Sequence, residues 1–323
     1  MAADPTELAQ PEAKADLRAK RTGPDKAFRV VLFASASMVL VIIGFIMFFL
    51  SIRTVPAIRH SGLKLLTTAV WSPPQQLFGF AGDLVGSLVI ALVALVVAVP
   101  IAVATAIAIN EYLPRRLRAP ITGLVDLLAA VPSLVYGLWG TFFLDRHLYR
   151  TSIWLGHHVN FFPLFRLAPR LNTNGSEFLA GLVVAIMVLP LMTAVTREIM
   201  SQVPRESCEA ALALGGTRWG MVTDVILPFA RNGIVGGAML SFGRAFGETI
   251  AVSLVLSADD HLTGHILQTG GGSVSALIAT QFTSTGALGR SALTVAGLVL
   301  FAVTLSVNTA ARIVVSRAAT ANQ

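Results

Sequence analysis

The sequence predicts an all-α polytopic membrane protein with six transmembrane helices, and three observations support this fold class. Of the 323 residues, 54% are hydrophobic and only 13% are charged, whereas soluble domains carry about 25% charged residues. The mean hydropathy is +0.73. Long apolar runs recur between polar segments, and each run is long enough to cross ~30 Å of hydrocarbon as a helix.

The elements follow in order along the chain. Residues 1–27 are polar and rich in proline and charge, so we expect a disordered tail. The first span, residues 28–50, is too long for the apolar part of a signal peptide, so it is predicted to remain uncleaved. Five further spans and a short second tail are predicted at 84–109, 121–144, 178–199, 230–256, 291–312 and 313–323. Pro100, Pro132 and Pro190 lie inside three of these spans and are expected to kink them.

Charge predicts the orientation in the membrane. Six spans place both ends on one side. The first tail, the 110–120 and 197–231 segments and the C-terminus together hold more lysine and arginine than the other three connections. Basic loops stay in the cytoplasm, so both termini are predicted to be cytoplasmic. The net charge of +7 is therefore assigned to topology and membrane lipid, and no nucleic-acid partner is expected.

Several chemistries are excluded by absent residues. Cys208 is the one cysteine, so the chain forms no internal disulfide and carries no C-x-x-C motif. The last lysine is Lys64, and no G-x-x-x-x-G-K-[ST] phosphate loop occurs, so the chain does not bind ATP by that route. We expect no bound cofactor, no metal site and no catalytic residues, and hence no enzymatic activity in this chain.

The segment 204–228, PRESCEAALALGGTRWGMVTDVILP, predicts two short helices joined by a glycine bend. Pro204 suits a first helical turn, and the pair Gly215–Gly216 suits the end of a helix. Thr217 is expected to cap a second helix that stops before Pro228.

Three charged residues fall inside predicted spans. Arg244 lies thirteen residues beyond Arg231, about 20 Å along a helix rising ~1.5 Å per residue. Glu248 follows at i+4, so a continuous helix places both side chains on one face. Such charges are costly in lipid, so this face, and Asp126 in the third span, are expected to meet protein or a water-filled path. A structural ion pair between helices is the alternative for all three residues.

Two pairs of glycines accompany these charges. Gly233 with Gly237 and Gly243 with Gly247 form G-x-x-x-G patterns, which let a neighbouring helix pack closely. The glycine stripe is rotated about 100° from the charged stripe. One face of the fifth span is therefore predicted to pack on a neighbour while the adjacent face lines a path.

Three stretches resemble one known family. The residues Glu209-Ala210-Ala211, then Gly215, then Val225-Ile226-Leu227-Pro228 resemble the EAA loop of ABC-importer permeases, with Val225 at the family's isoleucine position. The stretches DLLAAVPSLVYGLWG at 126–140 and AMLSFGRAFGETIAV at 238–252 resemble phosphate-specific permeases of the PstC type. Phe246 departs from the leucine or methionine usual there.

The resemblance implies a type I ABC-importer permease fold and a set of partners. It implies a second homologous permease, two ATP-binding subunits that hold ATP-Mg, and an extracytoplasmic phosphate-binding protein, in a prokaryotic cytoplasmic membrane. Coupling to the ATPase is assigned by the resemblance to Glu209, Ala210, Ala211, Gly215 and Trp219. The path for inorganic phosphate is assigned to Arg244, Glu248 and Asp126.

The chemistry agrees with phosphate but leaves alternatives open. Arginine offers a planar fork of donors and stays charged when desolvated. A carboxylate at Glu248 repels phosphate, so it either pairs with Arg244 or accepts the proton of hydrogen phosphate. The alternatives are an ABC permease for another oxyanion or small solute, a stand-alone anion channel or carrier, and a membrane scaffold with no transport role.

Overall fold

A computed structural model describes residues 23–159, 175–256 and 266–320. The chain divides into two units, Met1–Phe49 and Leu50–Gln323. Most of the tail predicted over 1–27 lies outside the described residues, and the chain is already helical from Gly23. Most of α1 (Gly23–Ser61) belongs to the first unit, where its large apolar side chains from Phe28 onward are exposed, as expected of a helix that faces lipid.

The described residues contain five helices that are long and apolar enough to cross a membrane, or six if one bent pair counts as a span. The bounds of the long helices are α1 Gly23–Ser61, α3 Ala81–Ile107, α7 Glu177–Ser201, α10 Leu227–Phe246 and α13 Ala287–Thr320. The tail predicted over 313–323 is wrong in part, because α13 continues to Thr320.

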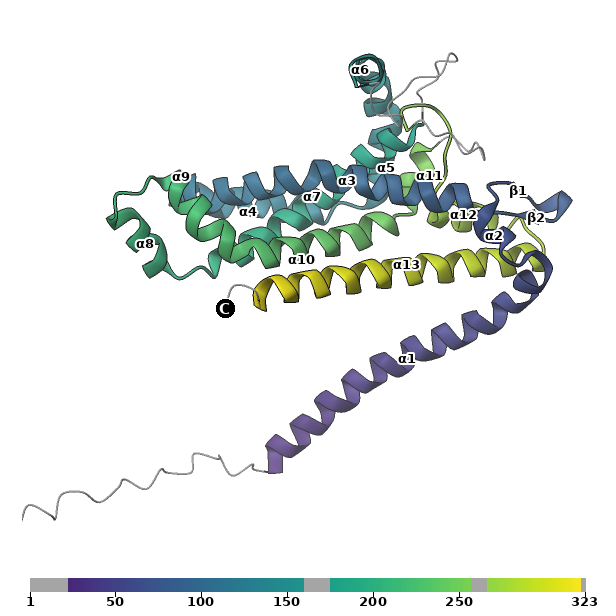
Figure 1. The fold of residues 1–323 in the computed structure, drawn as a ribbon, viewed down its shortest axis with the longest axis horizontal. Coiled ribbons are helices and arrows are strands. Elements are labelled where there is room, and N and C mark those ends of the chain that lie inside the picture. Colours follow the sequence, from purple (N-terminus) through teal and green to yellow (C-terminus); the bar gives the residue numbers. More distant parts are fainter. Residues whose placement is uncertain (1–22, 160–174, 257–265, 321–323) are drawn as a thin grey trace, which may run out of the picture. The chain divides into compact units, whose positions relative to one another are not determined.

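The core of the second unit is the contact of α3 with α7, with α10 packed against both (Figure 1). Ala91, Ala94 and Ala98 are fully buried and recur at helical spacing, so α3 presents a stripe of small side chains. A methyl group added at Gly181 of α7 would lie 2.6 Å from Cγ1 of Val93. Small residues let these helix backbones approach closely, which is how helices associate within lipid.

The third span, predicted over 121–144, is bent at Pro132 as expected, and the bend is sharp enough to break it into separate helices. Helix α4 (Arg115–Ala129) ends before Pro132, and α5 (Ser133–Trp139) leads through a π-helical turn into α6 (Asp145–His158), at 86° to α4. Pro132 has no N–H to give to the carbonyl of Leu128 and disfavours a helical residue before it. The hydroxyl of Tyr136 donates to that carbonyl at 2.8 Å instead.

The fifth span is also broken, and the continuous helix predicted over 230–256 is wrong. Helix α10 ends at Phe246, and α11 (Ile250–Val255) begins after a three-residue gap. The short helix expected to stop before Pro228 instead runs on into the span, because a π-helical turn at Val222–Ile226 joins α9 (Arg218–Met221) to α10. Pro228 is tolerated because it falls in the first turn of α10, where its N–H is not needed.

Short elements close one end of the bundle. They are α2 (Lys64–Thr67), the antiparallel pair β1 (Trp71–Ser72) and β2 (Leu77–Phe78), and α12 (Val274–Gln281). The rings of Trp71 and Phe78 pack edge to face at 5.3 Å. Ser291 of α13 inserts into the hydrogen-bond ladder of α1 beside Pro56, accepting from the N–H of Ala57 at 3.1 Å and donating to the carbonyl of Arg53 at 2.7 Å.

Replacing Gly181 by alanine is expected to lower the free energy of unfolding by about 1–3 kcal/mol, because the added methyl overpacks the contact of α7 with α3. The control is Gly123→Ala in α4, where nothing lies within 4 Å of the added methyl and helix propensity predicts a gain of up to ~1 kcal/mol. Thermal unfolding of the purified protein measures both. An unchanged or raised melting temperature for Gly181→Ala contradicts this packing.

Candidate transport path and coupling loop

Arg244 lies in the last turn of α10, on a face that the isolated chain leaves exposed. Gly236, Leu240 and Gly247 are exposed on the same side, at steps of three and four residues. The position at the end of a helix favours a cation, because the helix dipole is negative there. The arginine therefore sits at an interruption of an otherwise apolar span and faces out of this subunit.

The two glycine pairs of α10 differ in how closely neighbouring side chains approach them. Methyl groups added at Gly233 and Gly237 would meet side chains of α7, at 2.5 Å from Ile199 and 3.0 Å from Val195, so this pair permits the close packing predicted for it. The second pair does not. An added methyl at Gly243 makes only an ordinary contact, 3.7 Å from Thr304, and one at Gly247 meets only the carbonyl of Gly243.

Glu248 does not share a helical face with Arg244, which corrects the i+4 expectation. The helix ends two residues before Glu248, and its half-buried carboxylate accepts a hydrogen bond from the N–H of Ala251 at 3.3 Å. Among the described residues no ion pair within 4.0 Å joins Arg244 and Glu248. The carboxylate instead satisfies one of the free N–H groups at the start of α11.

Three buried serines, linked by hydrogen bonds, contact the backbone at the break between α10 and α11. Ser275 donates to the carbonyl of Glu248 at 2.6 Å, and the hydroxyls of Ser275 and Ser273 lie 2.9 Å apart. Ser87 of α3 lies 3.3 Å from the Ser273 hydroxyl and accepts from the N–H of Val274 at 2.9 Å. All three serines are buried. The sequence analysis missed them, because isolated serines in an apolar segment carry no pattern.

The breaks of the third and fifth spans lie side by side, since α5 packs on α11. A methyl group added at Gly137 of α5 would lie 2.9 Å from Cα of Ala251, and Thr141 donates to the carbonyl of Leu254 at 3.0 Å. Tyr136 interacts electrostatically with Arg244. Tyr136 thus belongs beside the candidate path, a role that the sequence did not indicate.

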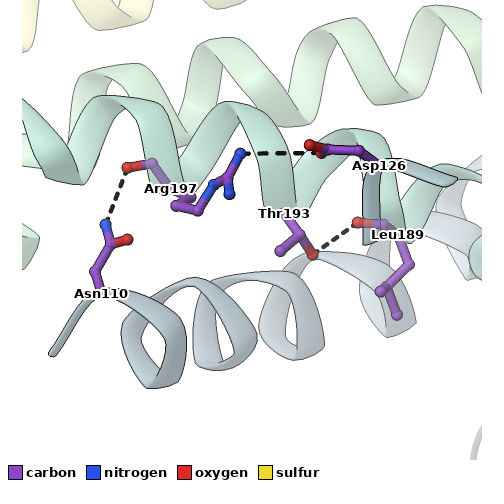
Figure 2. Close-up of polar contacts among 5 residues, drawn as sticks. All are labelled: Asn110, Asp126, Leu189, Thr193 and Arg197. Carbon is purple, nitrogen blue, oxygen red and sulfur yellow. Dashed lines mark hydrogen bonds and ion pairs between the residues drawn. The ribbon is translucent and has the colours of Figure 1, made fainter. Parts of the chain in front are cut away.

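Asp126 forms an ion pair with Arg197 and, among the described residues, none with Arg244, which is assigned to the same path. Its carboxylate lies 3.9 Å from the guanidinium of Arg197 in α7, and the carbonyl of Arg197 accepts from the side chain of Asn110 at 3.0 Å (Figure 2). The Asp126 side chain is 54% exposed, so the pair contributes little stability. This contact joins α4 to α7 and is the structural ion pair considered as an alternative. A role of Asp126 in the path stays a prediction.

The predicted coupling segment lies within residues 204–228, and its first helix, glycine turn and threonine cap form as expected. Helix α8 (Arg205–Ala213) ends in a Schellman turn, in which the N–H of Gly216 donates to Ala211 and that of Gly215 to Leu212. Gly215 has φ +86°, which strains any residue with a Cβ. Thr217 then caps α9 by accepting from the N–H of Gly220 at 3.0 Å.

The predicted coupling residues project from this segment. Glu209, Ala210, Gly215 and Trp219 are exposed, and Ala211 is half-buried. Leu214 is 90% exposed and the Trp219 ring 59% exposed. Large apolar side chains on a polar turn typify a protein contact site.

Comparison with known proteins identifies the family. The model of the family described as "Binding-protein-dependent transport system inner membrane component" matches residues 98–320. The chain belongs to this family. The match spans every residue assigned above to the path or to coupling, and the described helices agree with an inner-membrane location.

Relatives and solved structures agree with this membership. The chain is 37% identical over 302 residues to "Phosphate transport system permease protein PstC 2" of Mycobacterium tuberculosis, covering 92% of this chain and 93% of the relative. It is 36% identical over 290 residues to "Probable phosphate transport system permease protein PstC" of Methanocaldococcus jannaschii, covering 87% of this chain and 90% of the relative.

The fold matches those of two solved ABC transporters. One is a bacterial importer of the polysaccharide alginate, with TM-score 0.57, 16% identity and coverage of 90% of this chain and 98% of that chain. The other is the MetNI methionine transporter, with TM-score 0.52, 15% identity and coverage of 76% and 99%. At this identity the likeness establishes an ABC-permease fold and nothing about the solute.

Replacing Ser275 by alanine is expected to lower transport by the assembled importer about tenfold, because the carbonyl of Glu248 loses a buried donor worth roughly 1–3 kcal/mol. Ser275→Thr keeps the hydroxyl and should retain most activity. Hydrogen exchange over 247–255 should accelerate in the alanine variant alone. The control is Ser284→Ala, an exposed serine bonded locally to Gln281. Unchanged exchange and transport in Ser275→Ala contradict this role.

Proposed function

We propose that this chain is the permease subunit of an ATP-driven importer that moves inorganic phosphate into the cell. The observation that carries the proposal is an exposed arginine, Arg244, at the interruption of the fifth span in a chain whose relatives are named as phosphate permeases. Broken helices at such sites leave backbone groups and side chains free to meet a solute within the membrane. ATP-Mg is held by the partner ATPase subunits and not by this chain.

The chemistry of the break suits a transient anion site. Arg244 supplies a fork of donors that matches phosphate geometry. Among the described residues of α10 and α11 from Gly236 onward, Arg244 is the single arginine, so the ion is held weakly enough to leave again after binding. Because the Glu248 carboxylate forms no ion pair with Arg244 among the described residues, it disfavours a fully ionised phosphate and favours hydrogen phosphate, whose P–O–H group donates a hydrogen bond to it. Tyr136 completes the proposed lining.

The exposed stripe of Arg244 calls for a second subunit. A charged side chain facing lipid costs roughly 2.5–3.5 kcal/mol on insertion scales. A homologous second permease that covers the stripe of Gly236, Leu240, Arg244 and Gly247 removes this cost and encloses the path between the two chains. An extracytoplasmic phosphate-binding protein delivers the ion from the other side of the membrane.

The coupling segment is the contact for the ATP-binding subunits. Its exposed residues, Glu209, Ala210, Gly215 and Trp219 with the half-buried Ala211, form a short helix and turn that dock on a separate ATPase. This places α8 and both termini on the cytoplasmic side, in agreement with the distribution of lysine and arginine. Two ATP-binding subunits contact the two permeases.

Replacing Arg244 by leucine is expected to reduce phosphate uptake at least tenfold, because the path loses the cationic donor at the break. Uptake is measured in cells that lack their own high-affinity system and express all subunits, and co-purification checks assembly. The control is Arg231→Leu at the start of α10. Full uptake by an assembled Arg244→Leu complex refutes the path. If sulfate inhibits uptake by the wild-type complex as strongly as excess phosphate does, the permease carries another oxyanion.

Replacing Gly215 by alanine or Trp219 by alanine is expected to weaken ATPase binding about tenfold. The first change strains a φ of +86°, and the second removes an exposed aromatic anchor. Affinity of the purified ATPase for the permease pair in nanodiscs measures the effect. The control is Gly123→Ala in α4, which has no neighbour within 4 Å and lies outside both the segment and the stripe of Arg244. Wild-type affinity in both variants excludes this contact.

A further inference from the structure

A cavity of about 530 Å³ lies beside α8, and Glu209 of the proposed ATPase contact is at its edge. It is bounded by the end of the second span, the first turn of α4, the end of α7 and one side of α8. Its polar lining consists of Asn110, Glu111, Arg115, Arg118, Ser201, Arg205, Cys208 and Glu209.

The cavity carries unpaired charges of both signs. Arg118 donates to the backbone carbonyl of Asn110. Within the described residues, Arg115 and Arg205 form no ion pair with Glu111 or Glu209 within 4.0 Å. Arg115, Arg205 and Glu209 are exposed and Glu111 is half-buried, so these charges are accessible to a ligand of complementary charge. A ligand that fits this lining therefore presents an anion to the arginines and a cation to the glutamates.

The two carboxylates lie toward one thiol. The pKa of Cys208 is raised by burial and by the negative charges of Glu111 and Glu209. The thiol is therefore neutral at physiological pH and adds no charge of its own. Both carboxylates stay available to a cationic group, and a simple phosphate ion in the cavity meets repulsion from them.

The place of the cavity in the membrane points to the ligand. Two candidate spans end at its rim, Ala81–Tyr112 and Glu177–Ser201, so it opens at the boundary between hydrocarbon and water. Tyr112 and Leu117, both about half exposed, lie next to lining residues in the chain. At this boundary the abundant molecules with both charges are phospholipids whose headgroup joins a phosphate to a primary amine.

We propose that the cavity binds the headgroup of an aminophospholipid. Arg115 and Arg205 hold the phosphate and Glu111 and Glu209 hold the ammonium group. The volume falls within the range of about 300–1,000 Å³ typical of small-ligand sites. Because Arg205, Cys208 and Glu209 belong to α8, the bound lipid fastens the coupling helix to the ends of the membrane helices. The proposal stands whichever solute the permease carries.

The test is lipid binding to the delipidated, fully assembled importer, measured by native mass spectrometry. Short-chain phosphatidylethanolamine should bind about tenfold more tightly than phosphatidylcholine or phosphatidylglycerol, since only its headgroup forms charge-assisted hydrogen bonds on both sides. Arg115→Gln should weaken that binding about tenfold. Glu111→Gln should abolish the preference over phosphatidylcholine. The matched control is Arg218→Gln, an exposed arginine of α9 outside the cavity.

A second measurement uses only the wild-type complex, so it does not depend on whether the variants fold. Free phosphoethanolamine should displace the bound lipid from the wild-type complex, whereas phosphocholine and inorganic phosphate should not. Equal binding of the three lipids, or tighter binding in Glu111→Gln, overturns the proposal. Displacement by inorganic phosphate as efficient as by phosphoethanolamine also overturns it and indicates a simple anion site. Transport by Arg244 variants does not enter either readout, so this result and the proposed function are judged separately.

Discussion

Hydrocarbon offers no hydrogen bonds, so every backbone N–H and C=O within the membrane needs a partner inside the protein. Two spans of this chain are nevertheless interrupted, and the protein supplies the missing partners from side chains. The carbonyl of Leu128, to which Pro132 cannot donate, accepts from the hydroxyl of Tyr136 and from the N–H of Val131. At the second break Ser275 donates to the carbonyl of Glu248, and the Glu248 carboxylate accepts from an N–H of the first turn of α11.

The two breaks support each other and place the charges. Helix α5 packs on α11 through Gly137, so the segments that flank the two breaks contact each other. Arg244 is exposed on α10, acts electrostatically on Tyr136, and forms no ion pair with Glu248 among the described residues. The Glu248 carboxylate caps a helix, whereas the Arg244 guanidinium faces out of the subunit. This division explains how two opposite charges persist four residues apart in an apolar span.

At the end of the bundle that carries α8, backbone groups are again satisfied within the protein, but by local turns and caps. The Schellman turn at Gly215–Gly216 and the Thr217 cap satisfy the ends of two short helices locally. The π-helical turn before Pro228 then carries the chain from α9 into the fifth span without a loop. Trp219 and Gly247 are therefore joined by consecutive helical turns, from α9 through the π-helical turn to the end of α10.

The sequence by itself determined the fold class, the places of the helices and the form of the coupling turn, because these depend on apolar length and on residues close in the chain. Pro204, Gly215, Gly216 and Thr217 act within a few residues of themselves, so their roles were readable. Pro132 predicted a kink in the third span, and tertiary structure decided its angle and the break of the fifth span, because the hydrogen-bond partner at that second break comes from another element. Ser275 meets Glu248 from 27 residues away, and Ser87 meets Val274 across 187 residues. Asp126 likewise found Arg197 and not Arg244, since the 86° bend redirects α4, and no local pattern in the chain encodes that angle.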